Sequence, residues 1–216
     1  MLVERIMTEA KKIEKESRNY LGASLIGHAC NRYIWYSYND FERDDIDVKT
    51  QLVFDSGKAL EAVLIDYIVK SSLPDEIIYK PTKIFSDKEI TSFKGNPDLI
   101  IENPNGSLVV EIKTANGVNF RSLQKKGCRQ WRYQYFCQIQ CYMGFTEIHK
   151  ASILVMNKDT CELYEEEIEF DEMLFESIRN KAKEIIDSDH EPDRINSCAD
   201  YYVCKFCDFK KYCYSY

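Results

Sequence analysis

Residues 95–116 read GNPDLIIENPNGSLVVEIKTAN, and this stretch decides the fold expected of the chain. The pair Asn105-Gly106 is typical of a two-residue turn between antiparallel strands. Runs rich in isoleucine, leucine and valine lie on either side of it, at 97–102 and 108–113. Such runs flanking a turn predict a β-hairpin.

The two faces of this hairpin differ in chemistry. With the turn centred on Asn105-Gly106, Asp98 is expected opposite Lys113, and Ile100 opposite Glu111. Because side chains alternate between faces along a strand, Asp98, Glu111 and Lys113 then project from one side. The other side is apolar and consists of Leu99, Ile101, Leu108, Val110 and Ile112.

Two carboxylates and an ammonium gathered on one face suit metal-dependent hydrolysis. Carboxylate oxygens are ligands that Mg²⁺ or Mn²⁺ accepts, and a bound metal lowers the pKa of its water. A lysine beside the metal orients that water or stabilises negative charge in the transition state. The alternative is that Glu111 and Lys113 form only a surface ion pair on a solvated strand.

The remaining patterns place the hairpin within a mixed architecture. Helical periodicity predicts helices at 3–17, 28–38, 50–71, 119–126, 129–143 and 171–187. Further strands are expected at 76–85, 150–156 and 162–170. We expect an α/β fold, bordering on α+β, with a central mixed β-sheet flanked by helices.

The length of 216 residues suits one domain. Within residues 1–216 we expect three parts. They are a helical region at 1–50, a catalytic core at 51–170, and a C-terminal helix with a cysteine-bearing tail at 171–216.

Charge and hydropathy narrow the classes of function. The longest apolar runs are far too short to span a membrane, so we expect no membrane association. The N-terminus, MLVERIMTEAKKIEKE, is amphipathic rather than signal-like, which predicts a cytoplasmic location. A formal net charge of −7 argues against non-specific coating of nucleic acid, although metal-binding carboxylates contribute to it. The basic segment KKGCRQWR supplies the expected DNA contacts, Lys125, Lys126, Arg129 and Arg132.

Nine cysteines in a reducing compartment favour a metal or cluster site over disulfides. Cys204, Cys207 and Cys213 lie within one short loop, a pattern that indicates such a site with its fourth ligand elsewhere. Zinc and an iron–sulfur cluster both fit this spacing. Ordinary core or surface positions are expected for Cys128, Cys137, Cys141, Cys161 and Cys198.

Asp98 followed by Glu111-Ile112-Lys113 resembles the D…(D/E)xK core of the PD-(D/E)xK nucleases, in particular the RecB-like group. The resemblance extends over most of the chain and implies a restriction-endonuclease-like core. It also implies a DNA exonuclease that depends on Mg²⁺ or Mn²⁺, with Asp98, Glu111 and Lys113 at its active centre.

Two further motifs carry this resemblance. Gly57-x3-Glu61 is similar to an upstream helical motif that supplies another metal ligand, where many RecB-like relatives have histidine. Gln138-x3-Tyr142 is similar to a motif on the helix beside the metal site, and the resemblance implies that both side chains support catalysis. An i, i+4 spacing places them on one helix face.

The run LGASLIGHACNRYIWY, residues 21–36, resembles the N-terminal motif of iron–sulfur RecB-like nucleases. These include CRISPR-associated exonucleases and phage-encoded single-domain exonucleases. The resemblance implies that Cys30 joins the three late cysteines around a 4Fe–4S cluster, which would tie the two ends of the chain together. Zn²⁺ is the alternative occupant. Arg32 is a candidate for phosphate contact because of its fork of donors.

Two classes of function follow. The first is an exonuclease acting on single- or double-stranded DNA ends in recombination, repair or phage DNA processing. A recombination or helicase protein would be its partner, and a phage-encoded enzyme would work in the cytoplasm of its bacterial host. CRISPR spacer processing is a variant with other partners. The second class is a non-catalytic module that binds DNA ends or a partner and holds a structural iron–sulfur or zinc site.

Overall fold

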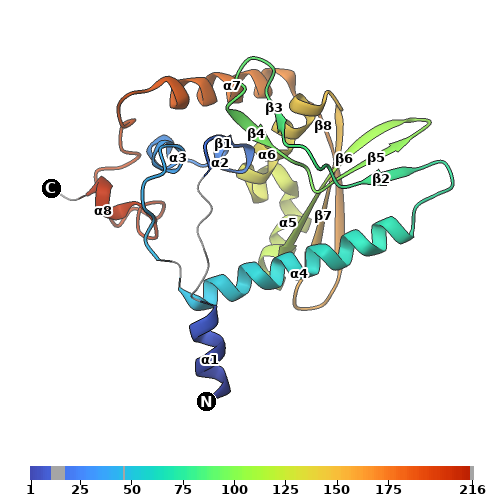
Figure 1. The fold of residues 1–216 in the computed structure, drawn as a ribbon, viewed down its shortest axis with the longest axis horizontal. Helices are drawn as coiled ribbons and strands as arrows, with labels where there is room; N and C mark the ends of the chain where they lie inside the picture. The colour runs from blue at the N-terminus through green and yellow to red at the C-terminus, as the bar shows by residue number, and fades with distance from the viewer. Residues whose placement is uncertain (11–17, 46, 215–216) are drawn as a thin grey trace.

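A five-stranded mixed sheet organises the chain, with strand order β2-β5-β6-β7-β8. The computed structural model describes residues 1–10, 18–45 and 47–214. The strands are β2 (Ile77–Tyr79), β5 (Leu99–Asn103), β6 (Gly106–Ala115), β7 (Lys150–Asn157) and β8 (Leu163–Glu169). The pairs are antiparallel except for β6 and β7, which run parallel at the centre of the sheet (Figure 1).

The predicted hairpin is β5–β6, but its register differs from the expectation. Ile100 pairs with Val109 rather than Glu111, so the pairing is shifted by two residues. The turn is centred on Pro104 and Asn105, because the last bridging pair is Asn103 with Gly106. The Asn105 N–H donates to the Asn103 side chain at 2.9 Å, and proline suits the first central position of a turn. An even shift keeps every side chain on its predicted face.

The face of the sheet made of odd-numbered β5 residues and even-numbered β6 residues is covered by α4 (Val48–Lys70). Figure 1 shows this helix running past the strands. The helix begins at Asp47, whose side chain accepts hydrogen bonds from the N–H groups of Lys49 and Thr50. Its side chains Leu64, Ile65 and Ile68 pack against the apolar hairpin face, Leu99, Ile101, Leu108, Val110 and Ile112. The predicted apolar side of the hairpin is therefore confirmed.

The opposite face carries the main core. Parallel neighbours need a crossover connection, and here α5 (Gly117–Trp131) and α6 (Tyr133–Thr146) lead from β6 to β7. Their side chains Phe120, Leu123, Ile139 and Met143 belong to the same buried cluster as Ile153 and Val155 of β7. The two helices predicted here are close to those observed, and the first contains a break at Gly127.

A second, three-stranded sheet was not predicted. It has the order β1-β4-β3, with β1 (Leu21–Gly22), β4 (Phe93–Gly95) and β3 (Phe85–Ser86). The single strand predicted at 76–85 is wrong, because it is divided between β2 and β3. Pro81 lies just after β2 and has no N–H to donate to a neighbouring strand.

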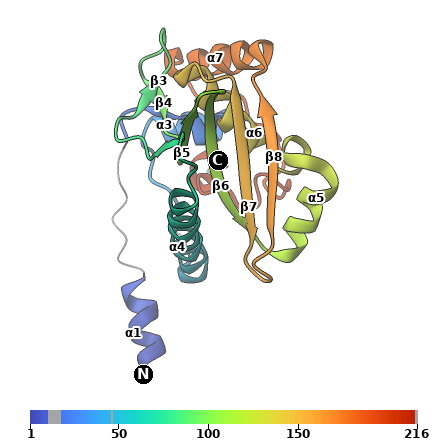
Figure 2. The ribbon, with the colours of Figure 1, turned by 90° about the vertical axis from the view of Figure 1, so that its right-hand side faces the viewer.

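The remaining helices come from the two ends of the chain. They are α1 (Leu2–Glu9), α2 (Ala23–Ile26), α3 (Asn31–Tyr38), α7 (Glu172–Asp187) and α8 (Lys210–Cys213). Of the first predicted helix, 3–17, the part at 11–17 lies outside the described residues. The predicted helix 28–38 begins only at Asn31, because Cys30 is extended and occupies the N-cap. Figure 2 shows α1 projecting away from the rest of the chain and α7 lying across one end of the large sheet.

The predicted fold class, a central mixed sheet with helices on both faces, is thus confirmed. Among the described residues, no helix combines the length and apolar character that crossing a bilayer requires.

Candidate active site

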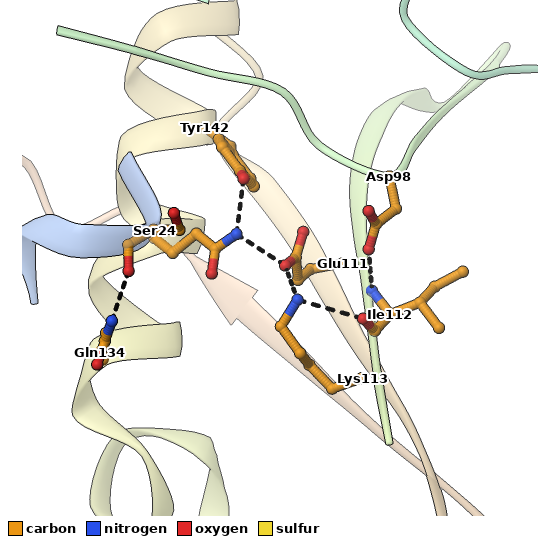
Figure 3. A network of polar contacts seen from close by, with 8 residues as sticks. Ser24, Asp98, Glu111, Ile112, Lys113, Gln134 and Tyr142 are labelled. Carbon is orange, nitrogen blue, oxygen red and sulfur yellow. Dashed lines mark hydrogen bonds and ion pairs between the residues drawn. The ribbon is translucent and has the colours of Figure 1, made fainter. Parts of the chain in front are cut away.

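Glu111 is the buried centre of a polar network on the core-facing side of β6 (Figure 3). Its Oε1 pairs with the ammonium of Lys113 and also accepts a hydrogen bond from Gln138 Nε2 at 2.9 Å. Burial raises the pKa of Glu111 to about 8, with the charge of Asp98 adding to this effect and that of Lys113 opposing it. The carboxyl group is therefore held where water does not stabilise its charge.

Lys113 supplies the positive charge of this network. Burial alone would lower its pKa, but the carboxylates of Glu111 and Asp98 outweigh that effect and raise the pKa. Its Nζ lies 5.2 Å from the centre of the Tyr135 ring, within the range of a cation–π contact. The lysine therefore remains an ammonium, restricted in position by carboxylates and an aromatic ring.

Asp98 approaches the same strand from the start of β5. Its Oδ2 accepts a hydrogen bond from the backbone N–H of Ile112 at 2.7 Å, which holds the carboxylate between the flanking residues Glu111 and Lys113. Glu61 reaches this region from α4. Burial and the charge of Asp98 raise the pKa of Glu61, whereas the charge of Lys113 lowers it. Three acidic side chains thus influence one another here.

Contact between α4 and β6 explains how Glu61 comes near the hairpin. A Cβ at Gly57, one helical turn before Glu61, would lie 3.4 Å from Thr114 Oγ1 of β6. That is an ordinary van der Waals distance, so this side of the helix lies directly against the strand. Both members of the predicted Gly57-x3-Glu61 motif therefore lie at the contact between these two elements.

Helix α6 supplies the remaining predicted side chains. Gln138 Nε2 donates both to Glu111 and to the hydroxyl of Tyr142, at 2.6 Å for the second contact. The other glutamines on this helix serve the scaffold: Gln134 donates to the carbonyl of Ser24, and Gln140 donates to that of Glu169. Gln138 is thus the glutamine of α6 that contacts the acidic centre.

The donor set fits a divalent cation. Glu111 Oε2 is buried and has no hydrogen-bond partner, which is costly for a carboxylate oxygen unless a cation completes its shell. Glu111, Asp98 and Glu61 are the oxygen donors that would hold such an ion. In the described residues, no three histidine, cysteine or acidic side chains are already arranged around a metal position.

The four predicted cluster cysteines come together at a separate place. Cys30, Cys204, Cys207 and Cys213 line one cavity, which lies between α3 and the C-terminal tail. All four are free thiols; three of them are buried, and Cys207 is half-buried. Burial, with a smaller contribution from the neighbouring Cys30 and Cys213, raises the pKa of Cys207 to about 11. Soft thiol donors at one cavity suit Zn²⁺ or an iron–sulfur cluster.

Aromatic packing joins α3 to the tail around this cavity. The ring of Tyr36 lies 5.4 Å from that of Phe209 and 5.8 Å from that of Tyr212. Among the other cysteines, Cys128, Cys137 and Cys141 are buried in the main core, whereas Cys161 and Cys198 are exposed.

The predicted DNA-contacting residues fall into two groups. Lys125, Lys126, Arg129 and Arg132 are all exposed, along α5 and its end. Arg32 instead lies beside the cysteines: it donates to the carbonyl of Pro192 at 2.6 Å and to Cys213 Sγ at 3.8 Å. It also pairs with Glu191 at 3.1 Å. Contact between Arg32 and phosphate stays a prediction.

Comparisons with known proteins agree with this arrangement. The solved alkaline exonuclease LHK-Exo from Laribacter hongkongensis superposes with a TM-score of 0.57 over 85% of this chain and 90% of that one, at 17% identity. The chain has the fold of an alkaline exonuclease. LHK-Exo has also been solved in complex with dAMP. The structure of SSO0001 matches with a TM-score of 0.58 over 99% of this chain and 96% of that one, at 20% identity.

Sequence comparison gives a match of narrower extent. Residues 70–149, fewer than half of the chain, match the family described as the YqaJ-like viral recombinase domain. No curated protein matches the chain. The matched segment contains the β5–β6 hairpin and all of α6, so it includes Asp98, Glu111, Lys113, Gln138 and Tyr142. The fold that the predicted resemblance implies is thereby confirmed, and the match to a viral recombinase domain agrees with it.

Sequence reasoning missed two neighbours of this site. Tyr135 lies on α6, one turn before Gln138, and its ring faces the Lys113 ammonium. Glu166 on β8 accepts a hydrogen bond from the backbone N–H of Cys128, directly after the break in α5. The alternation of β8 would have placed Glu166 on the core-facing side, but only if the strand register had been known.

Proposed function

We propose that this chain is a DNA exonuclease that uses a divalent cation, Mg²⁺ or Mn²⁺, to hydrolyse phosphodiester bonds at DNA ends. The observation that carries the proposal is the buried Glu111 carboxylate, which shares its surroundings with Asp98 and Lys113 and has one oxygen without a partner. The fold and the match to a viral recombinase domain support the same conclusion. Because LHK-Exo binds dAMP, DNA is the expected polymer.

Each side chain has a distinct role in this proposal. Asp98, Glu111 and Glu61 bind the cation, which when bound activates a water molecule and neutralises phosphate charge. Lys113 orients the attacking water and stabilises negative charge on the phosphate in the transition state. Gln138 holds the Glu111 carboxylate in place, and Tyr142 in turn holds Gln138.

The cysteine cavity has a structural role in the proposal. Cys30, Cys204, Cys207 and Cys213 would hold a 4Fe–4S cluster, with Zn²⁺ as the alternative. A bound group would fasten the helical region at 1–50 to the tail at 171–216, on either side of the catalytic core at 51–170. The proposed setting is DNA recombination or phage DNA processing in the cytoplasm, with a recombination or helicase protein as partner.

A nuclease assay with purified protein tests the function. Linear DNA labelled at its ends, both single- and double-stranded, is incubated with Mg²⁺ or Mn²⁺ and compared with covalently closed circular DNA. We expect mononucleotides from the linear substrates, intact circles, and no products in EDTA. DNA binding without any hydrolysis in either metal would favour the non-catalytic module instead.

A further inference from the structure

Helix α5 carries a break at Gly127, above the sheet face that holds Glu111. Gly127 has φ +70° and ψ 169°, a conformation that glycine adopts far more readily than other residues. The basic residues lie on both sides of the break: Lys125 and Lys126 precede it, and Arg129 and Arg132 follow it. The direction of the second half of the helix therefore depends on what holds this break.

Glu166 of β8 holds the break at Gly127 in place. Its Oε2 accepts hydrogen bonds from the backbone N–H of Cys128 and from the hydroxyl of Tyr164, both at 2.8 Å. A Cβ at Gly127 would lie 3.2 Å from Oε1 of the same carboxylate, so the chain approaches it closely. The carboxylate thus satisfies an N–H that the break removes from the helical pattern.

The strand register connects Glu166 to the proposed active site. Glu111 pairs with Ile153 on β7, and Ile153 pairs with Glu166 on β8. Residues paired in this way project on the same face of a sheet, so Glu166 and Glu111 share a face two strands apart, roughly 10 Å. Lys113, Val155 and Tyr164 form the adjacent row.

After the break, the chain runs from Glu166 towards Lys113. The rings of Trp131 and Tyr135 contact each other at 5.7 Å, and Tyr135 also contacts the Lys113 ammonium. The segment from Cys128 to Tyr135 therefore crosses the sheet face from Glu166 on β8 to Lys113 on β6. Arg129 and Arg132 are exposed along it, and Arg129 also pairs with Asp171 at 3.9 Å.

We propose that Glu166 is a positioning residue for a single DNA strand: it fixes the Gly127 break so that the exposed cations of α5 line the strand's path to Lys113. This inference rests on the proposed nuclease function and names the surface that binds its substrate. Glu166 is itself an anion, so direct contact with phosphate would be repulsive. Its effect on DNA must therefore act through the helix that it holds.

Binding measurements separate this role from a purely electrostatic one. Affinity for a fluorescent single-stranded oligonucleotide is measured over a range of salt concentrations, with Ca²⁺ in place of Mg²⁺. We expect Glu166→Ala to weaken binding about tenfold and to reduce the salt dependence by about one or two phosphate contacts. Glu166→Gln should bind like the wild type, because an amide oxygen still accepts the Cys128 N–H.

Glu167→Ala is the matched control, since it removes the same charge from an exposed neighbour on the opposite face of β8. It should leave binding unchanged or slightly tighter. Glu166→Ala binding as tightly as Glu167→Ala would overturn the proposal. So would a loss of the rate at saturating DNA with binding unchanged, because positioning of the strand predicts a loss mainly in KM.

A second variant covers the case in which Glu166→Ala does not fold. Gly127→Ala should weaken DNA binding in the same way, because alanine disfavours a φ of +70°; circular dichroism establishes that each variant is folded. Wild-type affinity in a folded Gly127→Ala would contradict the proposal. Hydrolysis by the wild type is measured separately, so an inactive wild type that binds DNA would refute the nuclease function without refuting the DNA-binding surface.

Discussion

At the residue scale, burial and several polar contacts fix the position of the Glu111 side chain. It is 1% exposed, pairs with Lys113, accepts from Gln138, and retains one buried oxygen without a partner. An amide that holds a carboxylate metal ligand affects the metal indirectly, by orienting the ligand and supporting its charge. Gln138 occupies that position here.

Gln138→Leu tests this indirect role. The substitution removes the donor to Glu111 while keeping a side chain of similar size in the core. We expect nuclease activity to fall by about 10- to 100-fold and the metal concentration for half-maximal activity to rise. Gln51→Leu is the control, because the Gln51 amide donates to Asp55 on its own helix; it should leave both unchanged. Unaltered metal dependence in Gln138→Leu would contradict the role assigned to it.

The predicted placement of Asp98, Glu111 and Lys113 on one face of the hairpin holds for a specific physical reason. The observed turn at Pro104-Asn105 shifts the register by two residues, and an even shift leaves the faces of Asp98, Glu111 and Lys113 unchanged. By contrast, the choice of Gln138 over its neighbours depends on how α6 is rotated against the sheet. Contacts between distant segments decide that rotation, and local spacing does not reveal it.

At the element scale, close approaches between elements place the site residues. A Cβ on Gly95 of β4 would lie 2.6 Å from the ring of Tyr142 and 2.8 Å from Ala23 Cβ. The absence of a side chain there allows α6 to bring Tyr142 against the small sheet. That sheet was not predicted, because strands as short as β1 and β3 lack a recognisable alternation.

Gly95→Ala should therefore destabilise the protein by about 1–3 kcal/mol, since the new methyl group displaces Tyr142 or Ala23. Gly57→Ala is a matched control within α4, where a Cβ meets Thr114 Oγ1 at an ordinary 3.4 Å. There alanine should be neutral or stabilising by up to about 1 kcal/mol. Denaturant unfolding measures both. Equal stability of Gly95→Ala and the wild type would contradict the close approach of Tyr142 and Ala23 to Gly95.

At the scale of the whole molecule, an early and a late segment of the chain meet at the cysteine cavity. Early residues such as Cys30 and late residues such as Cys213 line it together, and Tyr36 packs on Phe209 beside it. The sequence indicated this meeting only through a family resemblance, because no local pattern relates residues so far apart. The occupant of the cavity stays a prediction.

Cys30→Ser tests that prediction. We expect anaerobically purified wild type to contain iron and sulfide, or zinc, in stoichiometric amount, and Cys30→Ser to lose most of it and unfold at lower temperature. Cys198→Ser is the control, because Cys198 is an exposed thiol in the same tail. Elemental analysis and thermal unfolding measure both effects. Wild type without any metal would contradict the prediction, as would equal metal in Cys30→Ser.

The most direct test of the account is the single-turnover hydrolysis of end-labelled linear DNA by Glu111→Gln, with Glu167→Gln as the control. Glu111→Gln keeps the shape of the side chain but removes the charge that would bind the cation. We predict a loss of rate of at least about a thousandfold in Mg²⁺, with DNA binding in Ca²⁺ retained, and wild-type hydrolysis by Glu167→Gln. Hydrolysis by Glu111→Gln at the wild-type rate would show that the chemistry takes place without this carboxylate.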